Sequence, residues 1–185
     1  MQIKRLIFAM ALLPLLSFAA QSERLALPKE LQGSTVPNFF ILTADNKSEL
    51  YKDDIEETAK KSGAKRIIFS FFATWCVSCR EEFEILKKNA AEFEKRGVQI
   101  YLINVGENIH DYSGKASEMV KKYAGDYFPC YFDPNAILHP LFGLAKQGED
   151  LILPLTLIMD SNLRALGILI GKMGNDFPQV LWEEF

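Results

Sequence analysis

The sequence predicts an α/β fold in which one mixed sheet is flanked by helices. Residues 66–72 and 99–105 are rich in β-branched and aromatic side chains and hold few polar ones, as central strands buried on both faces do. A helical pattern lies between them. Two further strand-like runs, 155–159 and 165–170, are joined by a short polar loop and followed by a helical segment. A βαβ unit and a ββα unit that share one sheet make an α/β layer fold.

Composition sets the class of the molecule. The chain has 185 residues, of which 49% are hydrophobic and 24% are charged. This length suits one domain, and the apolar fraction suffices for a core without disulfide staples. An intrinsically disordered chain would be poorer in apolar residues, so that class is excluded.

The first 20 residues have the layout of a secretory signal. Lys4 and Arg5 give a positive start, residues 6–16 carry no charge, and residues 17–19 offer a cleavage site with small outer residues. The apolar run is shorter than the ~20 residues of a membrane span. We therefore expect residues 1–20 to be a signal peptide or, if retained, an N-terminal membrane anchor. Either reading takes the rest of the chain out of the cytoplasm.

Charge argues against one class of partner. Without residues 1–20 the chain keeps 19 lysines and arginines against 24 aspartates and glutamates, a net charge of −5. A chain with a net negative charge lacks the excess of basic residues that binds the phosphates of nucleic acid. The sequence therefore predicts no nucleic-acid partner.

The segments before the first central strand predict a linker, a hairpin and a helix. Residues 21–32 are polar and irregular, and we interpret them as a linker. A short apolar strand at 38–42 is followed by turn residues at 44–47, which indicates a small β-hairpin. A short charged helix is expected over 53–61, ended by Gly63.

A longer helix is expected between the central strands, from about residue 76 to residue 96, with Gly97 at its end. Its apolar residues recur at spacings of three and four and form one stripe that faces a core. The stripe consists of Cys79, Phe83, Leu86, Ala90 and Phe93.

The second half of the chain alternates between helix and strand. In chain order, the patterns predict an amphipathic helix over 113–124, a short strand over 128–132, a turn at 133–135, a short helix to Phe142, the two strands of the final hairpin and a closing helix over 175–185.

Cys76 and Cys79 lie at the start of the long helix, and their spacing is suited to reversible disulfide chemistry. Two intervening residues place them one helical turn apart, where a small adjustment brings the sulfurs together. So short a loop adds little stability, so the value of the bond is chemical. The helix start favours an anion at Cys76, and the thiolate is the reactive form. We therefore interpret Cys76 as the nucleophile, accessible to other proteins, and the core-facing Cys79 as the resolving cysteine.

Other cysteine chemistries fit less well. A zinc site needs a second cysteine pair or two histidines at ligand spacing, whereas Cys130 lies 51 residues beyond Cys79 and the two histidines, His110 and His139, form no ligand pattern. No metal is therefore predicted. A cysteine hydrolase needs a histidine base, which either histidine could supply only through the fold.

A peroxiredoxin-like site is also disfavoured. A Pro-x-x-x-Thr-x-x-Cys run that ended at Cys76 would need proline and threonine where Phe69 and Ala73 stand.

The active-site segment resembles the ResA/TlpA/CcmG branch of the thioredoxin superfamily, whose members are exported thiol–disulfide oxidoreductases. The resemblance covers about residues 33–175. The matching segments are 33–39, the Trp-Cys-x-x-Cys stretch at 72–83, 97–107, 128–133 and 153–156. It implies a thioredoxin-like domain over 33–185, with an N-terminal β-hairpin and an inserted αβ element.

The resemblance also implies a function. The branch commonly reduces the haem-binding cysteines of apocytochrome c during cytochrome c maturation, with electrons from a membrane thiol reductase. The expected substrates are therefore protein disulfides, and no cofactor is expected beyond the redox-active Cys76–Cys79 disulfide.

Further site residues follow from the resemblance. It implies that the Leu153–Pro154 bond is cis, that Pro154 packs against the active disulfide and that Leu153 hydrogen-bonds the substrate backbone. Trp75 is expected to line the substrate groove or to pack on the helix. Glu82 is expected to lie buried near the cysteines and to exchange the proton of the resolving thiol.

Three alternatives stay open. The Val77-Ser78 dipeptide departs from the thioredoxin pattern, so a disulfide oxidase or isomerase is a rival to the reductase. A chaperone-like binding module with an incidental disulfide is a rival of another class. Cys130 is interpreted as a small core hydrophobe, with a third redox thiol or a dimer bridge as the other readings.

Overall fold

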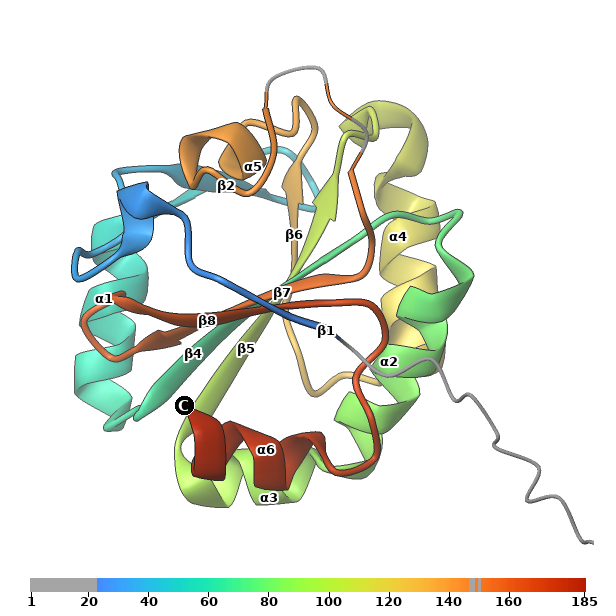
Figure 1. Ribbon diagram of the computed structural model, residues 1–185. Helices are drawn as coiled ribbons and strands as arrows, with labels where there is room; N and C mark the ends of the chain where they lie inside the picture. The colour runs from blue at the N-terminus through green and yellow to red at the C-terminus, as the bar shows by residue number, and fades with distance from the viewer. Residues whose placement is uncertain (1–22, 147–148, 150) are drawn as a thin grey trace, which may run out of the picture.

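The computed structural model describes residues 23–146, 149 and 151–185 and shows one twisted sheet between two layers of helices (Figure 1). The expected signal or anchor at 1–20 lies outside the described residues. Eight strands form the sheet in the order β1-β8-β7-β4-β5-β6-β2-β3. Their bounds are β1 Glu23–Leu25, β2 Phe40–Thr43, β3 Glu49–Tyr51, β4 Arg66–Phe72, β5 Val98–Val105, β6 Cys130–Asp133, β7 Leu155–Asp160 and β8 Ala165–Ile170.

The sheet is mixed, as the sequence predicts. The central strands β4, β5 and β6 run parallel, whereas β7 runs antiparallel to β4 and β8 antiparallel to β7. The expected N-terminal hairpin is confirmed as β2 and β3, and it continues the sheet beyond β6.

Helices cover both faces of the sheet. Side chains of α1 and α5 pack into the core on one face, and side chains of α2, α3, α4 and α6 pack into the core on the other. Successive residues of β4 alternate between these cores, as strand geometry requires. The bounds are η1 Lys29–Leu31, α1 Lys52–Ser62, α2 Val77–Lys88, α3 Ala90–Arg96, α4 Ile109–Tyr123, α5 Leu138–Leu141 and α6 Phe177–Glu184.

The long helix expected over residues 76–96 is divided at Asn89. Asn89 is the C-cap of α2, and both its backbone N–H and its side-chain amide donate to the Ile85 carbonyl, at 3.3 and 2.8 Å, so its side chain bonds back to the helix that ends there. Helix α3 then starts at once and ends at Gly97, as predicted. The apolar stripe survives the break, because all five of its residues are buried.

Two other boundaries differ from expectation. The sequence predicts a linker over residues 21–32, but the described part of this segment contains β1 and the short helix η1. Strand β1 pairs with the free edge of β8, and Leu31 of η1 is buried. Helix α4 begins at Ile109, four residues before the expected start, because the Asn108 side chain caps it by accepting a hydrogen bond from the His110 N–H.

No helix among the described residues combines the length and the apolar character that crossing a membrane requires.

Candidate active site

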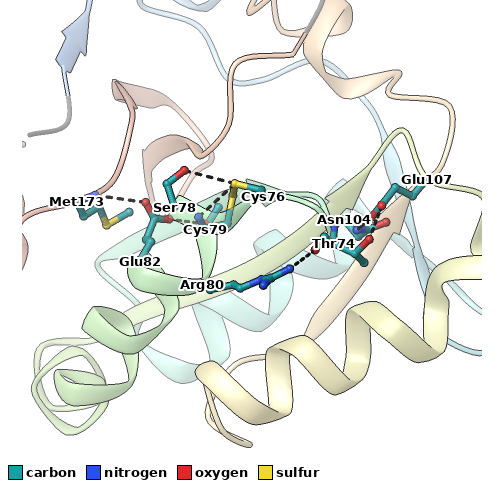
Figure 2. The surroundings of a disulfide bond; sticks show 10 residues. Thr74, Cys76, Ser78, Cys79, Arg80, Glu82, Asn104, Glu107 and Met173 are labelled. Atoms are coloured by element: carbon teal, nitrogen blue, oxygen red, sulfur yellow. Dashed lines mark hydrogen bonds between the residues drawn. A yellow bond between two sulfur atoms is a disulfide. The ribbon is translucent and has the colours of Figure 1, made fainter. Parts of the chain in front are cut away.

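The cysteine pair lies where the buried strand β4 gives way to α2. Cys76 is the N-cap of the helix, and Cys79 lies in its first turn. The two are joined by a disulfide, with their Cα atoms 5.4 Å apart (Figure 2). The expected position of the pair at a helix start is thus what the structure shows.

Two polar groups of the first turn approach the sulfur of Cys76. The backbone N–H of Cys79 donates to Cys76 Sγ at 3.1 Å, and the Ser78 hydroxyl lies 3.6 Å from the same sulfur (Figure 2). After reduction, both donors and the N-terminal end of the helix dipole favour the thiolate at this position. The contact with Ser78 was missed by sequence reasoning, because no pattern marks a serine inside the cysteine ring.

The pair is more enclosed than expected. Cys76 is 3% exposed and Cys79 is fully buried. Of the two cysteines, only Cys76 keeps any solvent-accessible surface. Its neighbours Trp75 and Val77 are each 64% exposed. The surface beside Cys76 is therefore formed by two exposed apolar side chains.

Glu82 is fully buried one helical turn after Cys79. The Ser70 hydroxyl donates to Glu82 Oε1 at 2.7 Å, and the Met173 N–H donates to Oε2 at 3.4 Å. Burial raises the pKa of Glu82 from 4.5 to about 7, and these hydrogen bonds offset part of the effect. A carboxyl with that pKa can hold or accept a proton near neutral pH.

Leu153 and Pro154 reach the same edge of the sheet as the disulfide. The Leu153–Pro154 bond is cis. Strand β7 begins directly after it, and Leu155 pairs with Phe71 near the end of β4, so the loop lies beside the chain that leads to Cys76. Leu153 packs against the core cluster that contains both cysteines.

A buried carboxylate holds the loop that leads into the cysteine pair. Glu107, which is 6% exposed, accepts hydrogen bonds from the Thr74 N–H at 2.8 Å and from the Thr74 hydroxyl at 2.6 Å. Asn104 Nδ2 donates to the same carboxylate at 2.5 Å, and Arg80 Nη2 donates to the Thr74 carbonyl at 2.9 Å (Figure 2). Sequence reasoning assigned no role to Glu107, since a glutamate 31 residues after Cys76 carries no local signal.

The other candidate residues lie apart from the cysteine pair. Cys130 is a half-buried free thiol at the start of β6, and burial raises its pKa to about 12. His110 is exposed on α4. His139 on α5 is buried against the Phe71 ring, with centroids 4.6 Å apart, and neither ring nitrogen has a hydrogen-bond partner among the described residues. Burial lowers the His139 pKa to about 4.

The AhpC/TSA family profile matches residues 32–165, which is most of the chain. Among curated proteins, DsbE of Escherichia coli, a thiol:disulfide interchange protein, is 28% identical over 158 residues, which cover 85% of this chain and 73% of DsbE. The thiol-disulfide oxidoreductase ResA of Bacillus subtilis is 25% identical over 145 residues, covering 77% of this chain and 69% of ResA.

Solved structures match the fold as well. A thiol:disulfide interchange protein of the thioredoxin family from Chlorobium tepidum superposes with a TM-score of 0.59 at 21% identity, covering 82% of this chain and 95% of that one. The fold of the chain is therefore thioredoxin-like, as the sequence predicts.

Proposed function

Because the chain belongs to the AhpC/TSA family, we propose that it is a thiol–disulfide oxidoreductase that reduces disulfides of exported proteins, apocytochrome c among them. The observation that carries the proposal is the Cys76–Cys79 disulfide at the N-terminus of α2, in which Cys76 is 3% exposed and Cys79 is fully buried. The names of two relatives support the reaction class: DsbE is a thiol:disulfide interchange protein, and ResA is a thiol-disulfide oxidoreductase.

The proposed cycle starts from the reduced pair. The Cys76 thiolate attacks one sulfur of the substrate disulfide, that bond breaks, and the first substrate sulfur leaves as a thiolate. The Cys79 thiol then loses its proton and attacks Cys76 Sγ. The Cys76–Cys79 disulfide forms and the second substrate thiolate is released, so two electrons have passed to the substrate. The described state, with the disulfide closed, is the oxidised end of this cycle.

Glu82 is the proposed acceptor of the Cys79 proton. It follows Cys79 by three residues on the same side of α2, and its pKa of about 7 lets it ionise under working conditions. Its negative charge disfavours the Cys79 thiolate, so Cys79 stays a thiol until Glu82 takes its proton.

We propose that the substrate binds across Trp75 and the half-buried Leu153, whereas Pro154, which the resemblance also implicates, is itself buried. Trp75 is 64% exposed, as is Val77, and Ile152 beside the Leu153–Pro154 bond is 61% exposed. These side chains supply apolar contact area around the edge of Cys76. An extended substrate segment with apolar residues beside its disulfide fits this surface.

The electron donor is proposed to be a membrane thiol reductase on the same side of the membrane. Residues 1–20 would export the chain to the periplasm or hold it there as an anchor. The proposed cycle uses only the redox-active Cys76–Cys79 disulfide and needs no bound cofactor.

The chain lacks the proline and threonine that a peroxide-reducing site of the peroxiredoxin type would need. Phe69 and Ala73, both buried, occupy the positions at which a peroxiredoxin-like motif has proline and threonine.

The experiment that tests the function is reduction of an oxidised Cys-x-x-Cys-His peptide by the dithiol form of the protein, together with the reduction potential of the pair. We expect transfer of one disulfide equivalent and a potential near the ~−270 mV of thioredoxin. A potential near the ~−120 mV of strong oxidants would assign the oxidase. If the Cys76→Ala, Cys79→Ala double variant still supported the host function, the binding-module alternative would replace the enzyme.

A further inference from the structure

Two buried hydroxyls lie next to Glu82 on the floor of the redox site. Ser70 of β4 and Thr156 of β7 are paired directly across the antiparallel strands, and both side chains are buried. Side chains alternate along a strand, and the residues two positions away, Ile68 and Ile158, belong to the core that contains the disulfide. Both hydroxyls therefore lie on the face of the sheet that α2 covers. Buried hydroxyls need a polar partner, and Glu82 offers one.

The carboxyl group of Glu82 is held from two sides. The Ser70 hydroxyl donates to Oε1 at 2.7 Å, and the Met173 N–H donates to Oε2 at 3.4 Å (Figure 2 shows the contact with Met173). One oxygen is thus bonded to a central strand and the other to the segment that follows β8. This arrangement fixes the plane of the carboxyl group.

Thr156 supplies a hydroxyl without a settled partner. Its Oγ1 is buried and forms no hydrogen bond of good geometry with any described residue. Burial raises the pKa of Glu82, and three donors oppose this effect, in decreasing order the Ser70 hydroxyl, the Met173 N–H and the Thr156 hydroxyl. A charged carboxylate can only accept hydrogen bonds, so both hydroxyls gain a stronger acceptor when Glu82 ionises.

We propose that Ser70 and Thr156 are positioning residues of the redox reaction, whose hydroxyls hold the Glu82 carboxyl in place and stabilise its charged form, ready to accept the proton of Cys79. The inference rests on the proposed function, in which Glu82 is that acceptor. The proton passes from Cys79 Sγ to a carboxylate oxygen, and the electron pair left on the sulfur forms the bond to Cys76 Sγ. The substrate sulfur leaves with the pair that had joined it to Cys76, so Ser70 and Thr156 neither gain nor lose a proton.

Among the described residues, no charge competes with the two hydroxyls for control of Glu82. Strands β4 and β7 each carry a single charged residue, Arg66 and Asp160, which pair at the opposite end of the strands. Glu81 and Lys172, the charged residues nearest along α2 and in the segment after β8, pair with each other at 2.7 Å. The pKa shift of Glu82 comes from burial and hydrogen bonds alone. Its titration therefore reports on its donors.

The direct test is titration of the Glu82 carboxyl by ¹³C NMR in the disulfide form, in which the cysteine pair does not titrate. Glutamate labelled at Cδ supplies the signal, and Glu82→Gln identifies it. We expect a midpoint near pH 7 in the natural chain, an upward shift of about one pH unit or more in Ser70→Ala and a smaller upward shift in Thr156→Val. Thr156→Ser, which keeps the hydroxyl, and Ser48→Ala, exposed in the turn after β2, should titrate as the natural chain does.

The pH profile of peptide reduction by the dithiol form tests the same hydroxyls in the reaction. In Ser70→Ala its inflection should move upward with the carboxyl midpoint. The rate at pH 7 should fall about fivefold, because the ionised fraction of Glu82 falls from half to about a tenth. Recovery toward the natural rate at pH 9 separates a shifted proton acceptor from a damaged fold.

The outcomes distinguish this inference from the function on which it rests. An unchanged carboxyl midpoint in both Ser70→Ala and Thr156→Val would overturn the inference, whatever the redox assay gave. A shifted midpoint beside an unshifted rate profile would also overturn it, because the hydroxyls would then serve the structure alone. A natural chain that reduced no disulfide peptide at any pH would overturn the proposed function, and a midpoint that still moved in the variants would set that failure apart.

Discussion

Both carboxylate oxygens of Glu107 accept hydrogen bonds from Thr74, one from its N–H and one from its hydroxyl. Glu107 follows β5, whereas Thr74 lies in the loop between β4 and α2, so the contact ties the loop before Cys76 to the neighbouring strand. The position of the reactive sulfur therefore depends on a carboxylate that never touches it. Glu107 acts as a positioning residue.

Replacing Glu107 tests this role. In Glu107→Gln one carboxylate oxygen becomes an NH₂ group, which cannot accept from Thr74 or Asn104. We expect the free energy of unfolding to fall by about 2 kcal/mol in chemical denaturation, because buried donors lose their acceptor. Reduction of the disulfide by dithiothreitol should also change in rate, which a purely stabilising role would leave alone. Glu118→Gln, exposed on α4, is the control and should stay within about 0.5 kcal/mol.

Glu82 predicts a pH dependence of stability. Its pKa rises from 4.5 to about 7 on folding, so the unfolded chain releases this proton first as pH increases. The stability associated with the protonated carboxyl is complete below pH 4.5 and is lost as pH rises toward 7. We expect Glu82→Gln to remove this loss, which makes the variant more stable than the natural chain by up to about 3 kcal/mol at pH 8.

The same variant tests the catalytic proposal. If Glu82 takes the Cys79 proton, the pH profile of substrate reduction should lose its inflection near 7 in Glu82→Gln. An identical profile in the two proteins would reduce Glu82 to a structural residue, whatever the stability measurements gave.

The roles of the two cysteines predict opposite trapping behaviour. Cys79→Ser lacks the sulfur that resolves the mixed disulfide, so it should accumulate adducts between Cys76 and its substrate, visible on non-reducing gels and by mass spectrometry. Cys76→Ser should trap none, because Cys79 is fully buried. Similar yields from the two variants would show that nucleophile and resolver are wrongly assigned.

His139 predicts a loss of stability in acid. Burial lowers its pKa from 6.5 to about 4, so the unfolded chain binds a proton first as pH falls, and stability decreases from pH 6.5 toward 4. Between pH 7 and pH 4 the free energy of unfolding of the natural chain should fall by about 3 kcal/mol relative to that of His139→Leu; the opposite contribution of Glu82 is present in both proteins and cancels in this difference. His110→Leu is the matched control at an exposed position and should keep the acid sensitivity. Urea denaturation between pH 4 and 7 measures all three proteins.

Sequence patterns predicted the parts of the fold that rest on local periodicity. The strand at 66–72 and the stripe on the helix after it were predictable because burial on one or both faces selects apolar residues at fixed spacing. The break at Asn89 was not, since it depends on one side chain that competes with the helical backbone. Strand β1 could not be predicted, because its pairing with β8 and not its own composition makes it a strand.

The site shows the same division. The cysteine pair was found because its spacing has chemical meaning by itself. The burial of Glu82 entered only through a family resemblance, since a run of charged residues gives no sign of which one turns inward. The carboxylate of Glu107 and the enclosure of Cys76 are products of tertiary structure, and no local pattern records them.

The central claim is that the Cys76–Cys79 bond opens and closes in the folded protein, although Cys76 is only 3% exposed. The most direct measurement is a titration with dithiothreitol under native conditions, with free thiols counted after acid quenching and folding followed by circular dichroism. We predict that the thiol count rises by two at an unchanged circular dichroism spectrum and returns on reoxidation. A disulfide that stays closed until urea unfolds the chain would contradict the claim.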